Sequence, residues 1–161
     1  MDDEKIILLP TTDAPLMTAL IKLPEVWAAV TDDSSPKLDE VTIAPRVADV
    51  RNRFLLVLVN GKVAGFFMLM YLSPGIYEFH TVLLGICRGA LAISAAKMAI
   101  DWMFANTPAL MLLAWCADYL PQTLVAALAV GGKKLGYVPN VIMKNGLPYG
   151  VTQMYMMKPE N

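Results

Sequence analysis

Side chains that build metal centres, disulfide frameworks and nucleic-acid surfaces are scarce in this chain. Its 161 residues include one histidine and two cysteines, and its formal net charge is −1. A single histidine makes a histidine-rich metal site hard to build, and the carboxylates form no ligand-like cluster, so we expect no metal. The basic residues form no stripe, so nucleic acid is not an expected partner. Cys87 and Cys116 have neither metal-like nor redox-like spacing, and we expect reduced, buried thiols.

A long uncharged apolar run is also missing, although 57% of the residues are apolar. The most apolar stretch, residues 83–116, contains Arg88, Lys97 and Asp101 and is broken by Pro108. A membrane-spanning helix needs about 20 apolar residues without such charges, so we expect no contact with a membrane. The N-terminal residues are acidic and show no signal-peptide pattern, so we expect a protein of the cytoplasm, either of a bacterium or of a phage-infected host.

Periodicity and turn residues predict a mixed α/β fold with a partly parallel sheet, formed by a single domain over residues 1–161. The Asn60-Gly61 pair is a strong signal for a tight hairpin. The expected strands are residues 5–9, 54–59, 62–72, 76–84, 109–116, 137–144 and 151–157. The expected helices are residues 14–30 with a break near Pro24, a short one after Pro45, and residues 89–106 and 123–135.

Two of these elements carry packing predictions. In the helix over residues 89–106 one face is formed by Leu91, Ala95, Met98 and Trp102. The run over residues 109–116 is continuously apolar, so a central strand buried on both faces is expected there, with Trp115 as a packing residue.

The strand over residues 76–84 leads through Gly85-Ile86-Cys87-Arg88-Gly89 directly into a helical pattern. The first backbone N–H groups of a helix lack internal partners, and the helix dipole makes that end positive. Gly89 lets the backbone approach a ligand closely, and Arg88 adds a fixed charge. This turn is therefore a candidate phosphate site; the alternative is an arginine that only caps the turn or pairs with Asp118.

Residues 83–92, Leu-Leu-Gly-Ile-Cys-Arg-Gly-Ala-Leu-Ala, resemble the acetyl-CoA motif of the GNAT superfamily of acyl-CoA-dependent N-acyltransferases. In that motif a strand end leads through a hydrophobic-x-Pro-x-x-Arg-Gly-x-Gly/Ala run into a helix. Residues 134–137, Lys-Leu-Gly-Tyr, resemble the signature that ends the following helix. The resemblance covers nearly the whole chain. Glu78-Phe79-His80-Thr81, with residues 83–84 and 87–89, is most similar to the short members found in tailed-phage genomes.

The resemblance implies a central mixed sheet of about six or seven strands flanked by about four helices. The sheet splays between the parallel strands 76–84 and 109–116. Acetyl-CoA is the implied acyl donor, with its pantetheine arm pairing near Leu83 and its pyrophosphate on the amides of the helix start. The implied cofactor-binding residues are Leu83, Leu84, Arg88, Gly89, Ala90, Leu91 and Ala92.

The implied activity is transfer of an acetyl group to a primary amine of unknown identity, by direct attack on the thioester. Glu78, His80 and Tyr119 are the candidate catalytic residues. Glu78 and His80 share a strand face, so they are expected to pair, and partial burial is expected to raise the pKa of Glu78. Tyr119 is the candidate acid. The alternatives are a structural carboxylate, a core histidine and a tyrosine that packs in a loop.

Several positions depart from the superfamily pattern. Gly85 replaces the usual proline, Leu91 stands where Gly or Ala is usual, Gly132 replaces a helical tyrosine, and the asparagine after the fifth strand is missing. These departures favour the alternative of a non-catalytic structural or assembly protein of a tailed phage, associated with the virion. A second alternative is an acyl-CoA-binding module without turnover. The closing strands are where a homodimer would pair.

Overall fold

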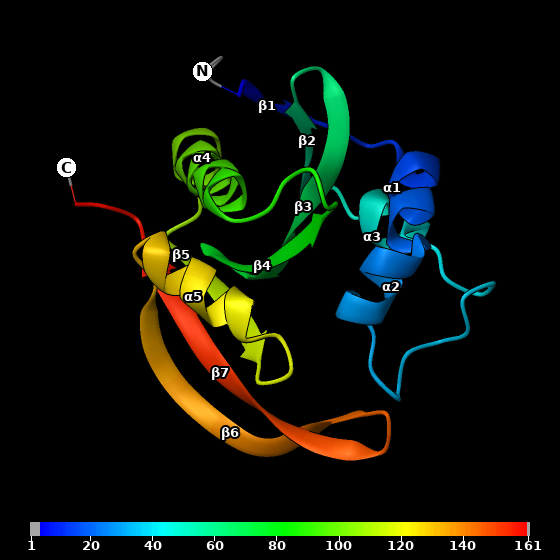
Figure 1. The fold of residues 1–161 in the computed structure, drawn as a ribbon. Helices are drawn as coiled ribbons and strands as arrows, with labels where there is room; N and C mark the ends of the chain where they lie inside the picture. The colour runs from blue at the N-terminus through cyan, green and yellow to red at the C-terminus, as the bar shows by residue number, and fades with distance from the viewer. Residues whose placement is uncertain (1–3, 161) are drawn as a thin grey trace.

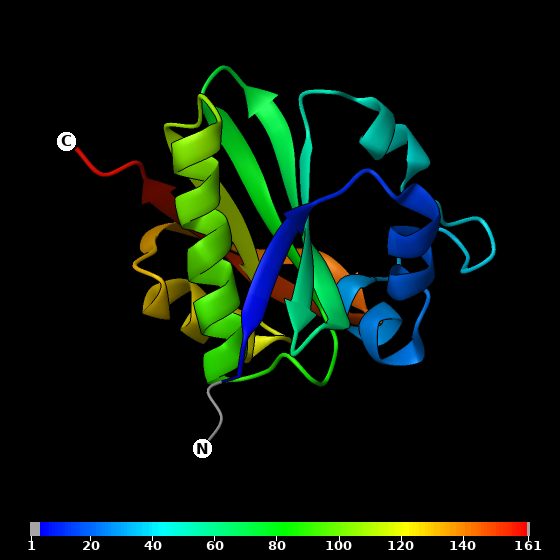
Figure 2. The same cartoon turned by 90° about the horizontal axis from the view of Figure 1, so that it is seen from above.

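The computed structural model describes residues 4–160, which form a seven-stranded sheet with helices on both faces (Figures 1 and 2). The strand order is β1-β2-β3-β4-β5-β7-β6, and every neighbouring pair is antiparallel except β4 and β5. The predicted mixed α/β sheet is confirmed. The strands are β1 (Ile6–Pro10), β2 (Arg53–Val59), β3 (Lys62–Ser73), β4 (Ile76–Leu83), β5 (Met111–Ala117), β6 (Lys133–Lys144) and β7 (Leu147–Met157).

Three short helices cover one face of the sheet and two helices cover the other (Figure 2). The first face carries α1 (Ala14–Ile21), α2 (Pro24–Val30) and α3 (Ala44–Ala48), and the second carries α4 (Ala90–Asn106) and α5 (Pro121–Ala129). The carboxylate of Asp13 caps α1 by accepting a hydrogen bond from the Leu16 amide at 2.9 Å. Within residues 4–160, no helix has both the length and the apolar character needed to cross a membrane.

The central strand β3 supplies side chains to a core on each face, because successive residues of a strand point in opposite directions. Phe66 and Met68 belong to the core under α1, α2 and α3, whereas Phe67 and Leu69 belong to the core under α4. All four are buried. The two cores hold β3 and β4 rigidly and thereby fix the strand edge that faces β5.

The sheet splays between its two parallel strands, as predicted. β4 and β5 pair only at Ile76–Met111, Tyr77–Leu112 and Glu78–Leu113. Beyond Glu78 the edge of β4 that faces β5 pairs with no other strand of residues 4–160, whereas β5 continues to pair with β7 as far as Ala117. The backbone groups of β4 after Glu78 are therefore available to a ligand that enters the gap.

The predicted helix over residues 123–135 is wrong at its C-terminal end. The helix ends at Ala129, and the chain turns at Gly131, which has φ +89°. β6 then begins at Lys133, so residues 134–137 lie in a strand that pairs with β7 and not at a helix end. Two consecutive glycines disfavour a helix, and the ladder with β7 provides hydrogen bonds that a continued helix would not gain.

The predicted face of α4 is right except at Met98, since Ala95 is buried and Leu91 and Trp102 pack against the core. Met98 is 40% exposed, and the buried face consists of Ala95, Ala96, Ala99, Ile100, Met103 and Phe104. Pattern reasoning favours the largest apolar side chains, but a face rich in alanine lets the helix axis approach the sheet closely. The large side chains of β2, β3 and β4 fill the remaining space.

Candidate active site

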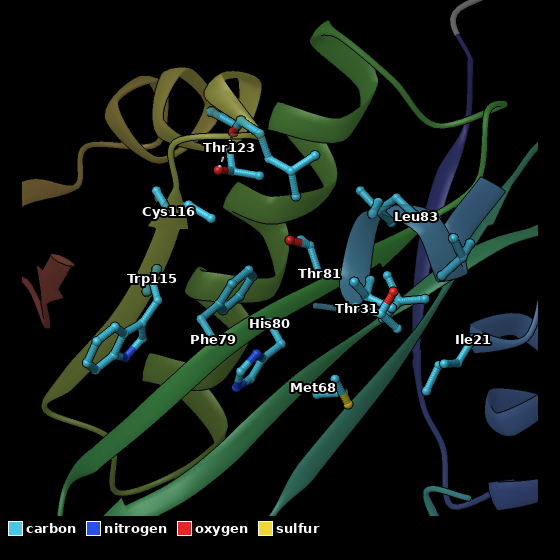
Figure 3. A pocket seen from close by; sticks show the side chains of 18 of the residues that line it. Ile21, Thr31, Met68, Phe79, His80, Thr81, Leu83, Trp115, Cys116 and Thr123 are labelled. Atoms are coloured by element: carbon cyan, nitrogen blue, oxygen red, sulfur yellow. Dashed lines mark hydrogen bonds between the residues drawn. The ribbon is translucent and has the colours of Figure 1, made fainter. Parts of the chain in front are cut away.

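A cleft of about 790 Å³ opens where β4 and β5 diverge (Figure 3). On one face of the sheet its lining includes Gly89 and Ala92 at the start of α4 and Ala126 of α5. On the other face it includes Trp27 of α2 and Arg46 of α3. The cleft therefore runs from one face of the sheet to the other, through the gap between the parallel strands.

The N-terminus of α4 opens into this cleft with its backbone donors free. Gly89 precedes the helix at φ +58° and ψ −129°, a conformation that favours glycine. No side chain caps the helix and no acidic residue lies in its first turn. A Cβ atom at Gly89 would have no other atom of residues 4–160 within 4 Å. Arg88 lies beside it, exposed, and also lines the cleft. This is the geometry of an anion site.

The seven residues predicted to bind the cofactor divide into two groups. Four of them line the cleft: Leu83, Arg88, Gly89 and Ala92. The side chains of Leu84 and Leu91 pack against the cores on opposite faces of the sheet, and Ala90 does not line the cleft either. The branched side chain of Leu91 therefore points into the core under α4. This departure from the superfamily pattern does not obstruct the helix start.

Glu78 and His80 are paired, as predicted from their shared strand face. His80 Nε2 lies 3.2 Å from Glu78 Oε1. His80 lines the cleft and is shown there in Figure 3, whereas Glu78 is not among the lining residues. Because Nε2 donates to the carboxylate, a neutral imidazole keeps a lone pair on Nδ1. The pair therefore places a base at the cleft with a carboxylate behind it.

The expected direction of the Glu78 pKa shift is wrong. The hydrogen bond from His80 holds the pKa of Glu78 below its ordinary value and outweighs the opposing effect of burial. The charges of His80 and Arg46 act in the same lowering direction. Glu78 therefore remains an ionised carboxylate near neutral pH, suited to orienting His80 and stabilising its charged form rather than to accepting the proton itself.

Tyr119 lies in the loop between β5 and α5 and lines the cleft. Its ring packs edge-on against Tyr149, with centroids 5.3 Å apart, and Lys144 Nζ lies 5.5 Å from its centroid. Burial raises the pKa of Tyr119, and the negative charge of Asp32 adds to this effect. The phenol therefore keeps its proton at neutral pH and is able to donate it.

Cys116 and Asp118, near the end of β5, are held by packing and by hydrogen bonds within the protein. Both cysteines are buried and free, as expected, and burial raises the pKa of Cys116, so its thiol stays protonated. The carboxylate of Asp118 accepts hydrogen bonds from the Tyr137 hydroxyl at 2.8 Å and the Gly150 amide at 3.2 Å. Asp118 is thus paired with the β6–β7 hairpin, and the alternative partnership with Arg88 is not formed.

The loop after α2 is tied to the tip of the β6–β7 hairpin. The carboxylate of Asp33 accepts hydrogen bonds from the amides of Asn145 and Gly146, each at 2.8 Å. Lys144 Nζ donates to the carbonyls of Ala28 at 2.7 Å and Thr31 at 2.6 Å. These contacts hold the neighbouring Asp32, which lines the cleft, in a defined position.

Trp115 is a site residue that sequence reasoning missed. It is 49% exposed and lines the cleft, so the prediction of a packing role is wrong. β5 is not buried on both faces because the core under α1, α2 and α3 includes residues of β2, β3 and β4 but none of β5. A continuous apolar run carries no alternation from which the open face could be recognised.

Comparisons with known proteins identify the fold. A family model described as "Protein of unknown function (DUF2824)" matches residues 47–161. No curated protein matches the sequence. One similar solved structure is a chimera of spermidine N-acetyltransferase SpeG from Vibrio cholerae and hSSAT, with a TM-score of 0.78, 18% identity and 95% of each chain covered. Another is the Vibrio cholerae spermidine N-acetyltransferase in complex with CoA and spermine, with a TM-score of 0.72, 15% identity and 95% of each chain covered.

A third is the Vibrio cholerae spermidine/spermine N-acetyltransferase in complex with manganese ions, with a TM-score of 0.73, 16% identity, and 96% of this chain and 93% of that chain covered. At these identities the likeness shows the fold alone. The fold is the GNAT N-acyltransferase fold, as the resemblance in residues 83–92 predicted. The assignment to the phage-type members and the cytoplasmic location stay predictions.

Proposed function

The chain belongs to the DUF2824 family of proteins of unknown function. On the basis of its cleft, we propose that the protein transfers an acetyl group from acetyl-CoA to a primary amine. One observation carries the proposal. A single cleft joins an uncapped helix N-terminus to a gap in the sheet that is bordered by His80 and Tyr119. The CoA bound to one Vibrio cholerae neighbour supports an acyl-CoA donor.

The donor would lie along the α4 side of the cleft. Its pyrophosphate accepts hydrogen bonds from the amides of residues 90–92, and Arg88 contributes positive charge. Its pantetheine arm pairs with the free backbone edge of β4 near Leu83, where β5 has diverged. This arrangement directs the thioester into the gap, toward the face of the sheet that carries His80.

The acceptor would enter from the side of α2 and α3. Its nitrogen lone pair attacks the thioester carbonyl carbon and forms the new C–N bond. His80 Nδ1 takes the proton that the nitrogen loses, and the ionised Glu78 stabilises the resulting imidazolium. The tetrahedral intermediate collapses with cleavage of the C–S bond. Tyr119 gives its proton to the departing CoA thiolate, and the products are an N-substituted acetamide and CoA.

The test is release of free thiol from acetyl-CoA in the presence of a panel of primary amines, with mass spectrometry of the products. We expect amine-dependent thiol release and a product that carries one added acetyl group. His80→Gln should reduce turnover by about 10²- to 10⁴-fold, the range for loss of a general base. Absence of turnover with every amine, in a folded protein that does not bind CoA, would contradict the proposal and favour the non-catalytic alternative.

A further inference from the structure

An indole side chain lies open to the cleft on the strand opposite His80. The parallel register pairs Glu78 with Leu113, so alternation along the two strands puts His80 and Trp115 on the same face of the sheet. Figure 3 shows their side chains on the two strands that border the gap. A half-exposed tryptophan on a central strand is unusual, since a residue of this size is normally highly buried there.

Much of the cleft lining on this face is apolar. The cleft is lined there by Trp27, Val30, Ile43, Met68 and Ile142. Helix α2, the residue that precedes α3, and strands β3 and β6 thus contribute carbon surface to the cleft on this side. An acceptor whose amine is held at His80 would rest its substituent on this surface.

Charges of both signs lie on this face, with an excess of carboxylates over guanidinium groups. Asp32 and Glu40 line the cleft, but Arg46 lines it too and lies close enough to Glu78 to lower its pKa. One oxygen of Asp32 is already occupied, since it accepts from the Ser34 amide and hydroxyl and from the Ser35 hydroxyl. A polyamine carries a positive charge on each nitrogen, and the guanidinium of Arg46 on this face would repel those charges.

We infer that the acceptor is a primary amine carried on a compact apolar body, such as an arylalkylamine, and that Trp115 determines this specificity by stacking on that body. The inference rests on the proposed acetyl transfer and names its substrate class. An aromatic ring offers a flat apolar surface to a ring or alkyl chain, and its face also attracts an ammonium group before that group loses its proton. The preference differs from the polyamines named for the Vibrio cholerae neighbours.

The experiment compares acetyl transfer to 2-phenylethylamine, ethylamine and spermidine. We expect kcat/KM for 2-phenylethylamine to exceed the values for the other two amines by about tenfold or more. Trp115→Ala should lower kcat/KM for 2-phenylethylamine about tenfold more than for ethylamine, mostly through KM. Trp115→Phe keeps an aromatic face and should retain most of the preference. Leu128→Ala is the control, since Leu128 is 55% exposed on α5 and does not line the cleft.

The outcomes separate this inference from the proposed function. Efficient transfer to spermidine, equal to or above that to 2-phenylethylamine, would overturn the inference and leave acetyl transfer intact. An equal loss on both small amines in Trp115→Ala would assign Trp115 a structural role and overturn its part in specificity. Lack of transfer to all three amines and to a wider amine panel would overturn the proposed function, and the acceptor class with it.

Discussion

Substitutions of Gly89 test whether the start of α4 holds phosphate. The residue has φ +58° and ψ −129°, and within the described part of the chain a Cβ atom there would meet nothing closer than 4 Å. Any non-glycine residue at this position therefore has the same backbone strain and no steric clash. This strain lowers the free energy of unfolding by about 1–3 kcal/mol. Gly89→Ala, Gly89→Glu and Gly89→Lys form a matched series in which strain is constant and only the charge changes.

The charge effect is estimated from Coulomb's law. A carboxylate at position 89 would lie about 5 Å from a phosphate on the amides of residues 90–92. Two unit charges at that distance interact by about 1 kcal/mol in water and about 3 kcal/mol at an effective dielectric constant of about 20. Relative to Gly89→Ala, we expect Gly89→Glu to bind CoA about 4- to 200-fold more weakly and Gly89→Lys to bind it at least as tightly.

The assay is isothermal titration calorimetry of each variant with CoA, alongside thermal unfolding. The three variants should unfold at similar temperatures, below that of the unsubstituted protein. Titrations at two salt concentrations should reduce the difference between the Glu and Lys variants at the higher salt, because exposed charges are screened. Equal CoA affinity of the three variants would refute a phosphate site at this turn.

Three further predictions concern the base, the acid and the sheet. Glu78→Gln should lower turnover by about 10²-fold, because a neutral amide no longer orients His80 or stabilises the positive charge that forms on it during proton transfer; unchanged turnover would contradict a role for the pairing. Asp32→Asn should move the descending limb to lower pH, because the Asp32 charge raises the pKa of Tyr119; a shift to higher pH would exclude Tyr119 as the acid. Gly65→Ala should lower the free energy of unfolding in urea by about 3 kcal/mol or more, since its Cβ would lie 2.1 Å from a β4 carbonyl oxygen at φ +128°; an unchanged midpoint would contradict this packing.

Local signals in the sequence predicted much of the fold. Asn60 and Gly61 both have positive φ, 52° and 77°, as a tight hairpin between β2 and β3 requires. Asn145 and Gly146, between β6 and β7, repeat the pattern at 54° and 74°. Such turns depend on two residues and their backbone preferences, so they can be recognised without knowledge of the rest of the chain. The strand–turn–helix element at Gly89 is local in the same sense.

The geometry of the candidate site was harder to predict, because it depends on contacts between residues that are far apart in the sequence. Glu78 and His80 could be predicted to pair because they lie two residues apart on one strand. The direction of the Glu78 pKa shift could not be predicted, because it depends on whether hydrogen bonding or burial dominates. The exposure of Trp115 depends on how much of that sheet face α1, α2 and α3 cover, which is a property of the whole fold.

The most direct test of the central claim is an experimental structure of the protein with bound CoA. We predict that the pyrophosphate lies on the amides of residues 90–92, that the pantetheine arm enters the gap between β4 and β5, and that the sulfur lies within reach of the Tyr119 hydroxyl. CoA bound away from the gap, or a pyrophosphate remote from the start of α4, would contradict the account.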